Sequence, residues 1–225
     1  MPRATESNTT AEKPLAERRP ARYSASLNKH QQRTEATKAK LLQAALRIFT
    51  RDGFEAARID DIASEAGYTR GAFYAHFGSK EDLFFAMVED QSNKHMQRIQ
   101  KALGRCTTDA SRLQTLREYY VMRVADRQWS ILTLEFKLYA LRHPKLRAKL
   151  AEMHRSIRMK IKWEGLESIL PAALMCAPQD EAVLKVTLHA ILHGLVLESA
   201  YDPASISEAK VKVQLRRLFD LLLTK

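Results

Sequence analysis

The stretch RIDDIASEAGYTRGAFYAHFGSKE, residues 58–81, decides the fold of this chain. Its first apolar side chains recur at intervals of three and four, which predicts a short helix with one apolar face: Ile59, Ile62, Ala63 and Ala66. Gly67 stands where a helix end favours a left-handed residue, and Thr69 offers an oxygen that can cap the next helix. Two short helices joined by so tight a turn cross steeply, which is typical of a helix-turn-helix motif that reads the major groove of DNA.

The second helix of this motif has an inward and an outward side. Phe73 and Phe77 are four residues apart and are expected to face inward. The positions left facing outward are Arg70, Gly71, Ala72, Tyr74 and His76. Because Gly71 and Ala72 have almost no side chain, the start of this helix can come close to base edges and to a thymine methyl group. The pattern therefore predicts a helix that contacts bases.

The net charge of +11 does not by itself indicate DNA binding. Residues 34–89 carry seven Lys or Arg against nine Asp or Glu, so this region is slightly acidic by formal count. Attraction to DNA must then depend on where charges lie, and we expect three acids to point away from the duplex: Asp60, Asp61 and Glu65. After Gly78, Ser79 and Asp82 form a cap-like start of a further helix, which puts Lys80 beside the DNA backbone.

Residues 37–88 resemble the tetracycline-repressor-like (TetR/AcrR) family of transcriptional regulators. The resemblance rests on the segments AALRIFTRDGFEAA, DIASEAG and RGAFYAHFGSKEDL together with their spacing. It implies base-edge contacts from Arg70, Gly71 and Ala72. It also implies contacts to phosphates from Thr69, Tyr74, His76 and Lys80. Arg58 replaces the family's usual Ser or Thr cap and Tyr68 replaces a small or aliphatic turn residue, and each is a further candidate for a DNA contact.

The composition predicts an all-α protein. The 225 residues are 45% hydrophobic, include only seven glycines, and show apolar spacings of three and four throughout. Two cysteines, Cys106 and Cys176, are too few for a disulfide framework or a zinc site. We see no apolar run of about 18 residues and no signal peptide, which favours a cytoplasmic protein. No phosphate loop, nucleophile elbow or other catalytic set is visible, so we expect no enzyme activity and no cofactor.

Three regions are expected. Residues 1–33 are predicted to be a disordered basic arm, which either contacts phosphates or is a solvated tail without a role, through Arg18, Arg19, Arg22 and Lys29. Residues 34–80 form the helix-turn-helix domain. Residues 81–225 form a larger domain that, by the resemblance, binds an effector and forms the dimer. Its helices are predicted at 80–103, 110–126, 128–142, 144–168, 180–200 and 207–223.

A homodimer is favoured by two matched apolar stripes on the last two predicted helices. The stripes consist of Leu184, Leu188, Ile191 and Leu195, and of Val211, Leu215, Leu218 and Leu222. Such helices can pair with their copies in a four-helix bundle, or they can pack within one chain, and periodicity does not distinguish the two. The segment HGLVLESAYDP followed by an amphipathic helix resembles the family's dimerisation pair. A two-fold dimer implies an inverted-repeat operator.

The effector pocket is placed around the helix predicted at 128–142, which is apolar on most sides. Glu135 on this helix is expected either to pair with Arg123 or to face a cavity. His189 and His193 have the spacing of two metal ligands, but no Glu follows the first, so we expect hydrogen-bonded histidines and no metal site. The basic segment 142–162 either holds an anionic effector such as an acyl thioester, lies against a membrane or DNA surface, or is a solvated helix face, which is the interpretation that we favour. The candidate pocket residues are Arg123, Trp129, Glu135, Phe136, Tyr139, Trp163, His189 and His193.

Together these features predict a cytoplasmic, homodimeric, sequence-specific DNA-binding regulator. We expect a repressor that a small-molecule effector releases from its operator by a population shift. The alternative is a ligand-sensing helical module whose N-terminal helices bind a protein partner, which the acidity of residues 34–89 favours.

Overall fold

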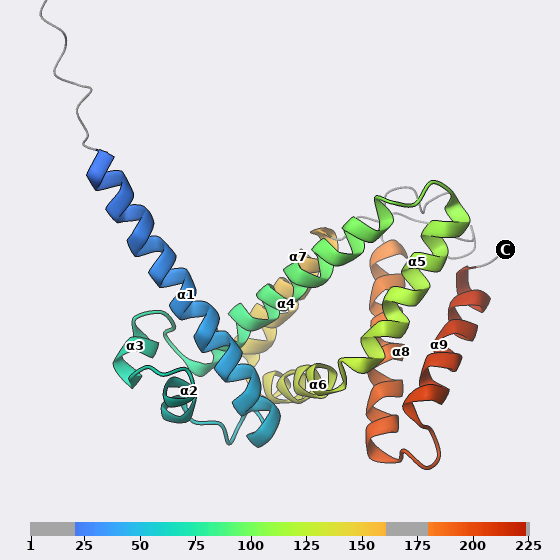
Figure 1. Cartoon of the computed structure of the whole chain (residues 1–225). Helices are drawn as coiled ribbons and strands as arrows, with labels where there is room; N and C mark the ends of the chain where they lie inside the picture. Colours follow the sequence, from blue (N-terminus) through green and yellow to red (C-terminus); the bar gives the residue numbers. More distant parts are fainter. Residues whose placement is uncertain (1–20, 161–179, 224–225) are drawn as a thin grey trace, which may run out of the picture. The chain divides into compact units, whose positions relative to one another are not determined.

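The structure is a computed structural model that describes residues 21–160 and 180–223 (Figure 1). Within those ranges all regular elements are helical, which confirms the prediction of an all-α protein. Helix α4 has the predicted bounds, and the other predicted helices agree within a few residues as far as the described ranges extend. The elements are α1 (Ala21–Asp52), α2 (Ile59–Glu65), α3 (Arg70–Tyr74), α4 (Lys80–Leu103), α5 (Asp109–Met122), the 3-10 helix η1 (Arg123–Ala125), α6 (Arg127–Leu141), α7 (Pro144–Lys160), α8 (Asp180–Tyr201) and α9 (Glu208–Leu223).

Two compact units are present, one ending at Lys40 and one beginning at Leu41. The prediction of disorder over residues 1–33 is wrong for the part that is described, because α1 begins at Ala21. The physical reason is that residues 21–52 contain no Gly or Pro and many strong helix formers, so the helix can extend into a polar segment. Arg18 and Arg19 lie outside the described residues, as do the side chains of Arg22 and Lys29.

The first hydrophobic core lies within the unit that begins at Leu41. It joins the last turns of α1 to α2, α3, α4, α6 and α7. Phe54, Phe84 and Phe136 are each fully buried at its centre. The Phe84 and Phe136 rings stack with centroids 3.8 Å apart, and Phe54 meets Phe136 edge-on at 4.7 Å. The helix-turn-helix therefore shares its core with the helices that follow it.

The second core consists of α5, α8 and α9, which lie side by side in Figure 1. It buries four residues that were predicted to form a dimer interface: Leu184, Leu188, Val211 and Leu215. Ile191 and Leu195 pack against the same core, Leu218 is half-buried, and the side chain of Leu222 lies outside the described part. Assigning the four buried residues to the dimer interface was wrong, because periodicity identifies an apolar face but not the surface that covers it.

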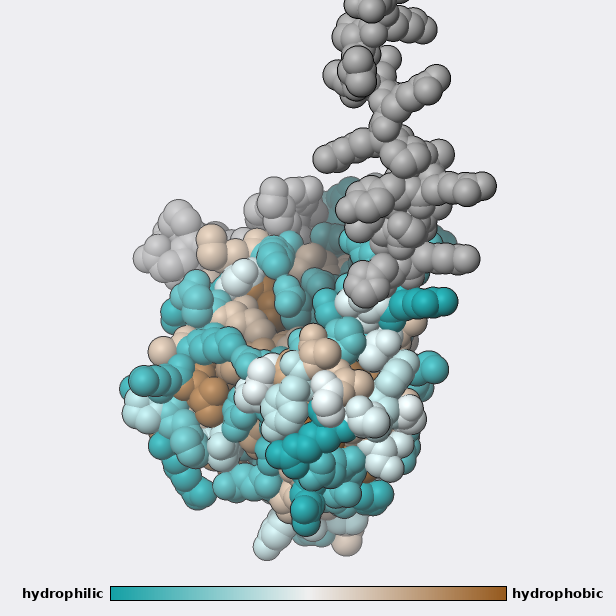
Figure 2. Space-filling model, turned by 90° about the vertical axis from the view of Figure 1, so that its left-hand side faces the viewer, coloured by the Kyte–Doolittle hydropathy of each residue, from teal (hydrophilic) through white to brown (hydrophobic). Residues whose placement is uncertain are grey.

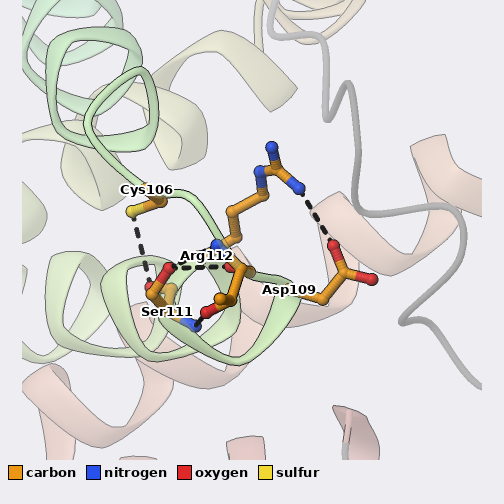
Figure 3. A network of polar contacts seen from close by, with 5 residues as sticks. Cys106, Asp109, Ser111 and Arg112 are labelled. Carbon is orange, nitrogen blue, oxygen red and sulfur yellow. Dashed lines mark hydrogen bonds and ion pairs between the residues drawn. The ribbon is translucent and has the colours of Figure 1, made fainter.

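The turn between α4 and α5 is held by local polar contacts (Figure 3). Thr108 and Ser111 form a capping box, with the Ser111 N–H donating to Thr108 Oγ1 over 3.2 Å. Arg112 pairs with Asp109 at 2.9 Å. The partly buried sulfur of Cys106 lies 3.2 Å from Thr115 Oγ1. These contacts satisfy the first N–H groups of α5 and fix the turn that sets α5 beside α4.

Candidate nucleic-acid interface and ligand cavity

The turn between α2 and α3 has the geometry that its residues predict. Gly67 has a φ of 76°, the left-handed conformation that favours glycine, and the Tyr68 N–H donates to the Ala63 carbonyl over 2.8 Å. Thr69 caps α3 by accepting a hydrogen bond from the Ala72 N–H at 3.2 Å. Arg58 precedes α2 without any side-chain capping bond. The turn is therefore built from contacts between close neighbours in the chain.

Helix α3 presents a polar face to solvent. Phe73 and Phe77 are buried as predicted, whereas Arg70, Gly71 and Tyr74 are exposed. Figure 2 views the side of the molecule that carries α2 and α3, where hydrophilic residues cover most of the surface. The helix ends at Tyr74, before His76 and Phe77, which were predicted to lie on it. Two further candidates in this region are only half-exposed: Ala72 and His76.

Arg70 is held in place on this face by two neighbours. Its guanidinium donates to the Asp60 carboxylate over 2.8 Å and to the Tyr74 hydroxyl over 3.4 Å. The Asp60 charge raises the pKa of Arg70 above its ordinary value. Asp60 thus lies beside Arg70, while Glu65 pairs with Arg47 at 2.6 Å. Both ends of the Arg70–Asp60 pair are exposed, so water competes for it and the guanidinium can exchange partners.

Lys80 and Tyr68 have structural partners that the sequence did not indicate. The Lys80 ammonium donates to the carbonyls of Glu55 and Ala57, each over 2.9 Å, and lies 4.7 Å from the centre of the Phe54 ring. Burial lowers its pKa. Tyr68 is half-buried against the first core. Lys80 therefore ties the start of α4 to the loop between α1 and α2, a structural role that its sequence position did not indicate.

The same loop is held from the other side by Glu135 on α6. Its Oε1 accepts a hydrogen bond from the Phe54 N–H over 2.6 Å. Gly53 has a φ of 78°, and a Cβ added to it would lie 2.8 Å from the same oxygen. The expectation that Glu135 pairs with Arg123 or faces a cavity was wrong. Helix α6 is apolar on most sides, so its sequence could not show which side meets the loop.

Phe136 and Tyr139 were also predicted to line the pocket, and this was wrong as well. Phe136 is fully buried in the first core. Tyr139 packs against that core and donates from its hydroxyl to Glu81 over 3.2 Å. Both residues therefore belong to the packing interface between α6 and the helix-turn-helix region. Trp163, another candidate, lies outside the described residues.

Two adjoining cavities, of about 80 and 190 Å³, lie among α4, α5, α6, α7 and α8. They share five lining residues: Ser92, Arg123, Trp129, Ile157 and His189. His193 lines the larger one. The lining therefore includes four of the predicted pocket residues, which come from η1, α6 and α8: Arg123, Trp129, His189 and His193. A third, more open hollow of about 510 Å³ between α4 and α5 adjoins the smaller cavity, and its lining includes Glu118 and Asp126. It shares four residues with that cavity: His95, Ile99, Tyr119 and Arg123.

Sequence reasoning missed several polar residues of these cavities. They are His95 on α4, Tyr119 on α5, Lys137 on α6, and His154 and Arg158 on α7. Single polar residues on amphipathic helices carry no local signal of a cavity. One indication was available: the excess of basic residues over 142–162, which includes Arg158, and for which a solvated helix face was favoured over an anionic-effector site.

The histidines of the cavities are neutral at neutral pH. Burial, and secondarily nearby cations such as Arg123, lower the pKa of His95 and His189 to about 4. Burial and Lys137 lower the pKa of His154 to about 4 and that of His193 to about 3. His189 Nδ1 lies 2.8 Å from the Lys185 carbonyl, so this nitrogen carries the proton of the neutral ring. Among the described residues no three His, Cys, Asp or Glu gather as a metal site would require.

Two family profiles match the chain. Residues 41–87 match bacterial regulatory proteins of the tetR family, and residues 110–224 match the C-terminal domain of BetI-type transcriptional repressors. The chain belongs to the tetR family. Its α2–turn–α3 segment is accordingly the DNA-binding helix-turn-helix of a transcriptional regulator, and this finding supports DNA binding over the alternative of a protein partner. TetR-family members are regulatory proteins.

The relatives agree with this assignment. The repressor SCO4008 of Streptomyces coelicolor is 46% identical over 55 residues, 24% of this chain and 29% of that protein. The regulator YdgC of Bacillus subtilis is 26% identical over 184 residues, 79% of this chain and 90% of that protein. The matches to the Bacillus subtilis regulators YerO and YfiR span less than a third of those proteins, 18% and 31%.

Solved structures share the fold at low sequence identity. The regulator FadR of Bacillus subtilis, solved with stearoyl-CoA, is 16% identical with a TM-score of 0.60 and covers 80% of this chain and 96% of its own. A regulator of Saccharomonospora viridis, solved with choline, is 20% identical with a TM-score of 0.62 and covers 84% of this chain and 97% of its own. The two bound molecules differ in charge and size, so fold likeness does not select a ligand.

Residues Ala182–Tyr201 of α8 are long and apolar enough to cross a membrane by length and composition. In the structure α8 packs against α6, α7 and α9. One of its sides lies in the second core, with Leu188 and Leu192 almost fully buried. These contacts account for the apolar residues on that side of α8, whereas Val183, Val186, Leu197 and Tyr201 are exposed.

Proposed function

We propose that this tetR-family protein is a homodimeric repressor that acts in the cytoplasm on an inverted-repeat operator. In this proposal α3 enters the major groove, and a small-molecule effector in the cavities between α4 and α8 releases the DNA. The single observation that carries the proposal is the exposed start of α3. A Cβ added to Gly71 would have only the Thr69 hydroxyl nearby, at 3.8 Å, so the helix offers an open edge to base pairs.

Individual contacts follow from this placement. We assign base-edge contacts to Arg70, Gly71 and Ala72, and phosphate contacts to Thr69, Tyr74 and His76, as the family resemblance implies. Arg70 reaches a guanine edge by giving up Asp60 and keeping its stacking on Tyr74, whose ring centre is 5.5 Å from the guanidinium. Arg58 is exposed at the start of α2 and is assigned a further phosphate contact.

The dimer is assigned to the exposed side of α8 and α9. This side is opposite the buried stripe and carries apolar side chains that a soluble monomer seldom exposes together. Tyr201 is 85% exposed, Val183 60% and Leu221 79%. The remaining members of this surface are Val186, Leu197 and Val213. Packing against a second copy would remove these side chains from water.

Helix α6 is assigned the role of connecting effector and DNA. Trp129, Thr133 and Lys137 on α6 line the cavities, and Glu135 on the same helix accepts the Phe54 N–H at the end of α1. A ligand that prefers one position of α6 would therefore also prefer one position of the helix-turn-helix. A difference in affinity between two such positions is sufficient to shift the population toward the state with lower DNA affinity.

The test is a titration of the full chain against DNA from upstream of its own gene, followed by fluorescence anisotropy with excess competitor DNA. The proposal expects saturable binding that survives the competitor. The Arg70→Ala variant should bind more weakly and discriminate less between the operator and single-base mutants of it. Binding that competitor DNA abolishes, for the wild-type chain, would contradict the proposed reading of sequence by α3.

A further inference from the structure

The two inner cavities share a buried positive charge that has no counter-ion among the described residues. Arg123 in η1 is only 8% exposed, and its side chain makes no hydrogen bond or ion pair in the described part of the chain. Its Nε is buried without any partner. Leaving a guanidinium unpaired in the interior is costly, because the group loses water without gaining another acceptor. Such a residue is expected where a ligand supplies the acceptor.

The other charges of the inner cavities have the same sign. Lys137 and Arg158 are half-buried and line the larger cavity, and burial together with mutual repulsion lowers the pKa of Lys137. Neither inner cavity has an Asp or Glu among its lining residues in the described ranges. Inside these two cavities a cation such as choline would meet three positive groups and no carboxylate among the described lining residues, since Glu118 and Asp126 line the outer hollow.

The remaining surface of the smaller cavity is mainly apolar. Its lining includes four apolar side chains, three from α4 and one from α5: Met96, Ile99, Leu103 and Leu116. Trp129 and Ile157 lie where the two cavities meet. A ligand that fills both cavities therefore needs an apolar body and a negatively charged head that reaches Arg123. The modest volumes of about 80 and 190 Å³ fit a small molecule.

We infer that the cavities bind a small amphipathic organic carboxylate, with the Arg123 guanidinium as its ion-pair partner. A carboxylate matches one planar guanidinium in both charge and geometry, because two parallel N–H groups can donate to its two oxygens. The inference names the ligand class of the effector site and to that extent rests on the proposed function. Neutral His95 and His193 each have one ring N–H that can donate to the same head group, whereas the N–H of His189 already donates to the Lys185 carbonyl.

The experiment titrates octanoate and benzoate into the full chain by calorimetry, beside octanamide, benzamide, octyl phosphate and choline. We expect each carboxylate to bind about tenfold or more tightly than its uncharged amide, since a desolvated ion pair is lost with the charge. We expect no binding of choline. Equal affinity for acid and amide, failure of both carboxylates, preference for octyl phosphate, or binding of choline would each overturn the inference.

Two variants separate Arg123 from general positive charge. Arg123→Met should abolish the preference for acid over amide, whereas Arg147→Gln, an exposed residue of α7 outside the cavity lining, should leave it unchanged. Unliganded Arg123→Met should be at least as stable to urea as the wild type, because an unpaired buried charge is replaced by an apolar side chain. A loss of stability in this variant would identify Arg123 as a structural residue and refute its role as ligand partner.

Operator binding is measured in the same preparations, so the two proposals can fail separately. Carboxylate binding without release of DNA would leave the ligand class intact and contradict the effector role. Operator binding by a protein that takes up neither carboxylate would refute the ligand class alone.

Discussion

Gly53→Ala tests the link between α6 and the helix-turn-helix, and Gly67→Ala is its matched control. Both glycines have nearly the same left-handed φ, 78° and 76°. A Cβ at position 67 meets nothing within 4 Å, whereas one at position 53 meets Glu135 Oε1 at 2.8 Å. The two substitutions therefore share the backbone cost and differ only in the contact with Glu135.

The magnitudes follow from this difference. The left-handed conformation costs an alanine about 1–2 kcal/mol, partly offset by about 0.4–1 kcal/mol from the stiffer unfolded chain, so Gly67→Ala should destabilise by about 1 kcal/mol. Gly53→Ala must also displace the Glu135 carboxylate from the Phe54 N–H, 2.6 Å away. Loss of a hydrogen bond to a charged group adds about 1.5–3 kcal/mol.

The assay is the free energy of unfolding in urea for both single variants, for Glu135→Ala, and for Gly53→Ala combined with Glu135→Ala. In the Glu135→Ala background the cost of Gly53→Ala should fall to that of Gly67→Ala, because the clashing carboxylate is gone. If Gly53→Ala and Gly67→Ala differ by less than about 0.5 kcal/mol, the limit of additivity, the contact has no energetic role and the proposed function of α6 loses its support.

Three other predictions concern Lys80, the dimer surface and pH. Lys80→Met should lower the free energy of unfolding in urea by about 1–3 kcal/mol, because two carbonyls lose their donor. An unchanged free energy of unfolding would contradict this structural role and leave the predicted phosphate contact as the role of Lys80. Leu197→Arg should give a monomer in light scattering while Arg217→Ala, exposed on α9, stays dimeric; a dimeric Leu197→Arg variant would move the interface elsewhere. Because the pKa values of the buried histidines fall from 6.5 to about 4 or 3, the unfolded chain binds protons between pH 6.5 and about 4 that the folded chain does not, and stability should decrease as pH falls through this window. Urea midpoints that stay constant from about pH 6.5 to 4.5, or the same pH slope in His193→Gln, would contradict this reading of the cavity.

The connection between cavity and DNA-binding helices has a simple physical basis. Helix α6 contributes to the cavity lining with one side and to the first core with another, through Phe136. Well-packed interiors transmit displacement, because neighbouring side chains have little free volume into which to relax. A ligand that moves α6 must therefore act on the loop that Glu135 and Lys80 hold.

The sequence alone was sufficient to predict the helix-turn-helix, because the contacts that define this motif are local. Thr69 caps a helix three residues away, Gly67 adopts its own backbone conformation, and Phe73 and Phe77 share a face by spacing alone. The helix bounds of α4 and the all-α class follow from the same short-range rules. Residue type and neighbours within about four positions contain this information.

Only the tertiary structure decided which surfaces meet. Glu135 binds an N–H that is 81 residues away in the chain, and Lys80 binds carbonyls more than 20 residues before it. The stripe of Leu184 and Leu188 is covered by α5 and α9 of the same chain, which leaves the opposite side for a partner. Periodicity shows that a face is apolar, but long-range packing determines which element covers it. Long-range packing also places the Arg123 side chain in the lining of the cavities.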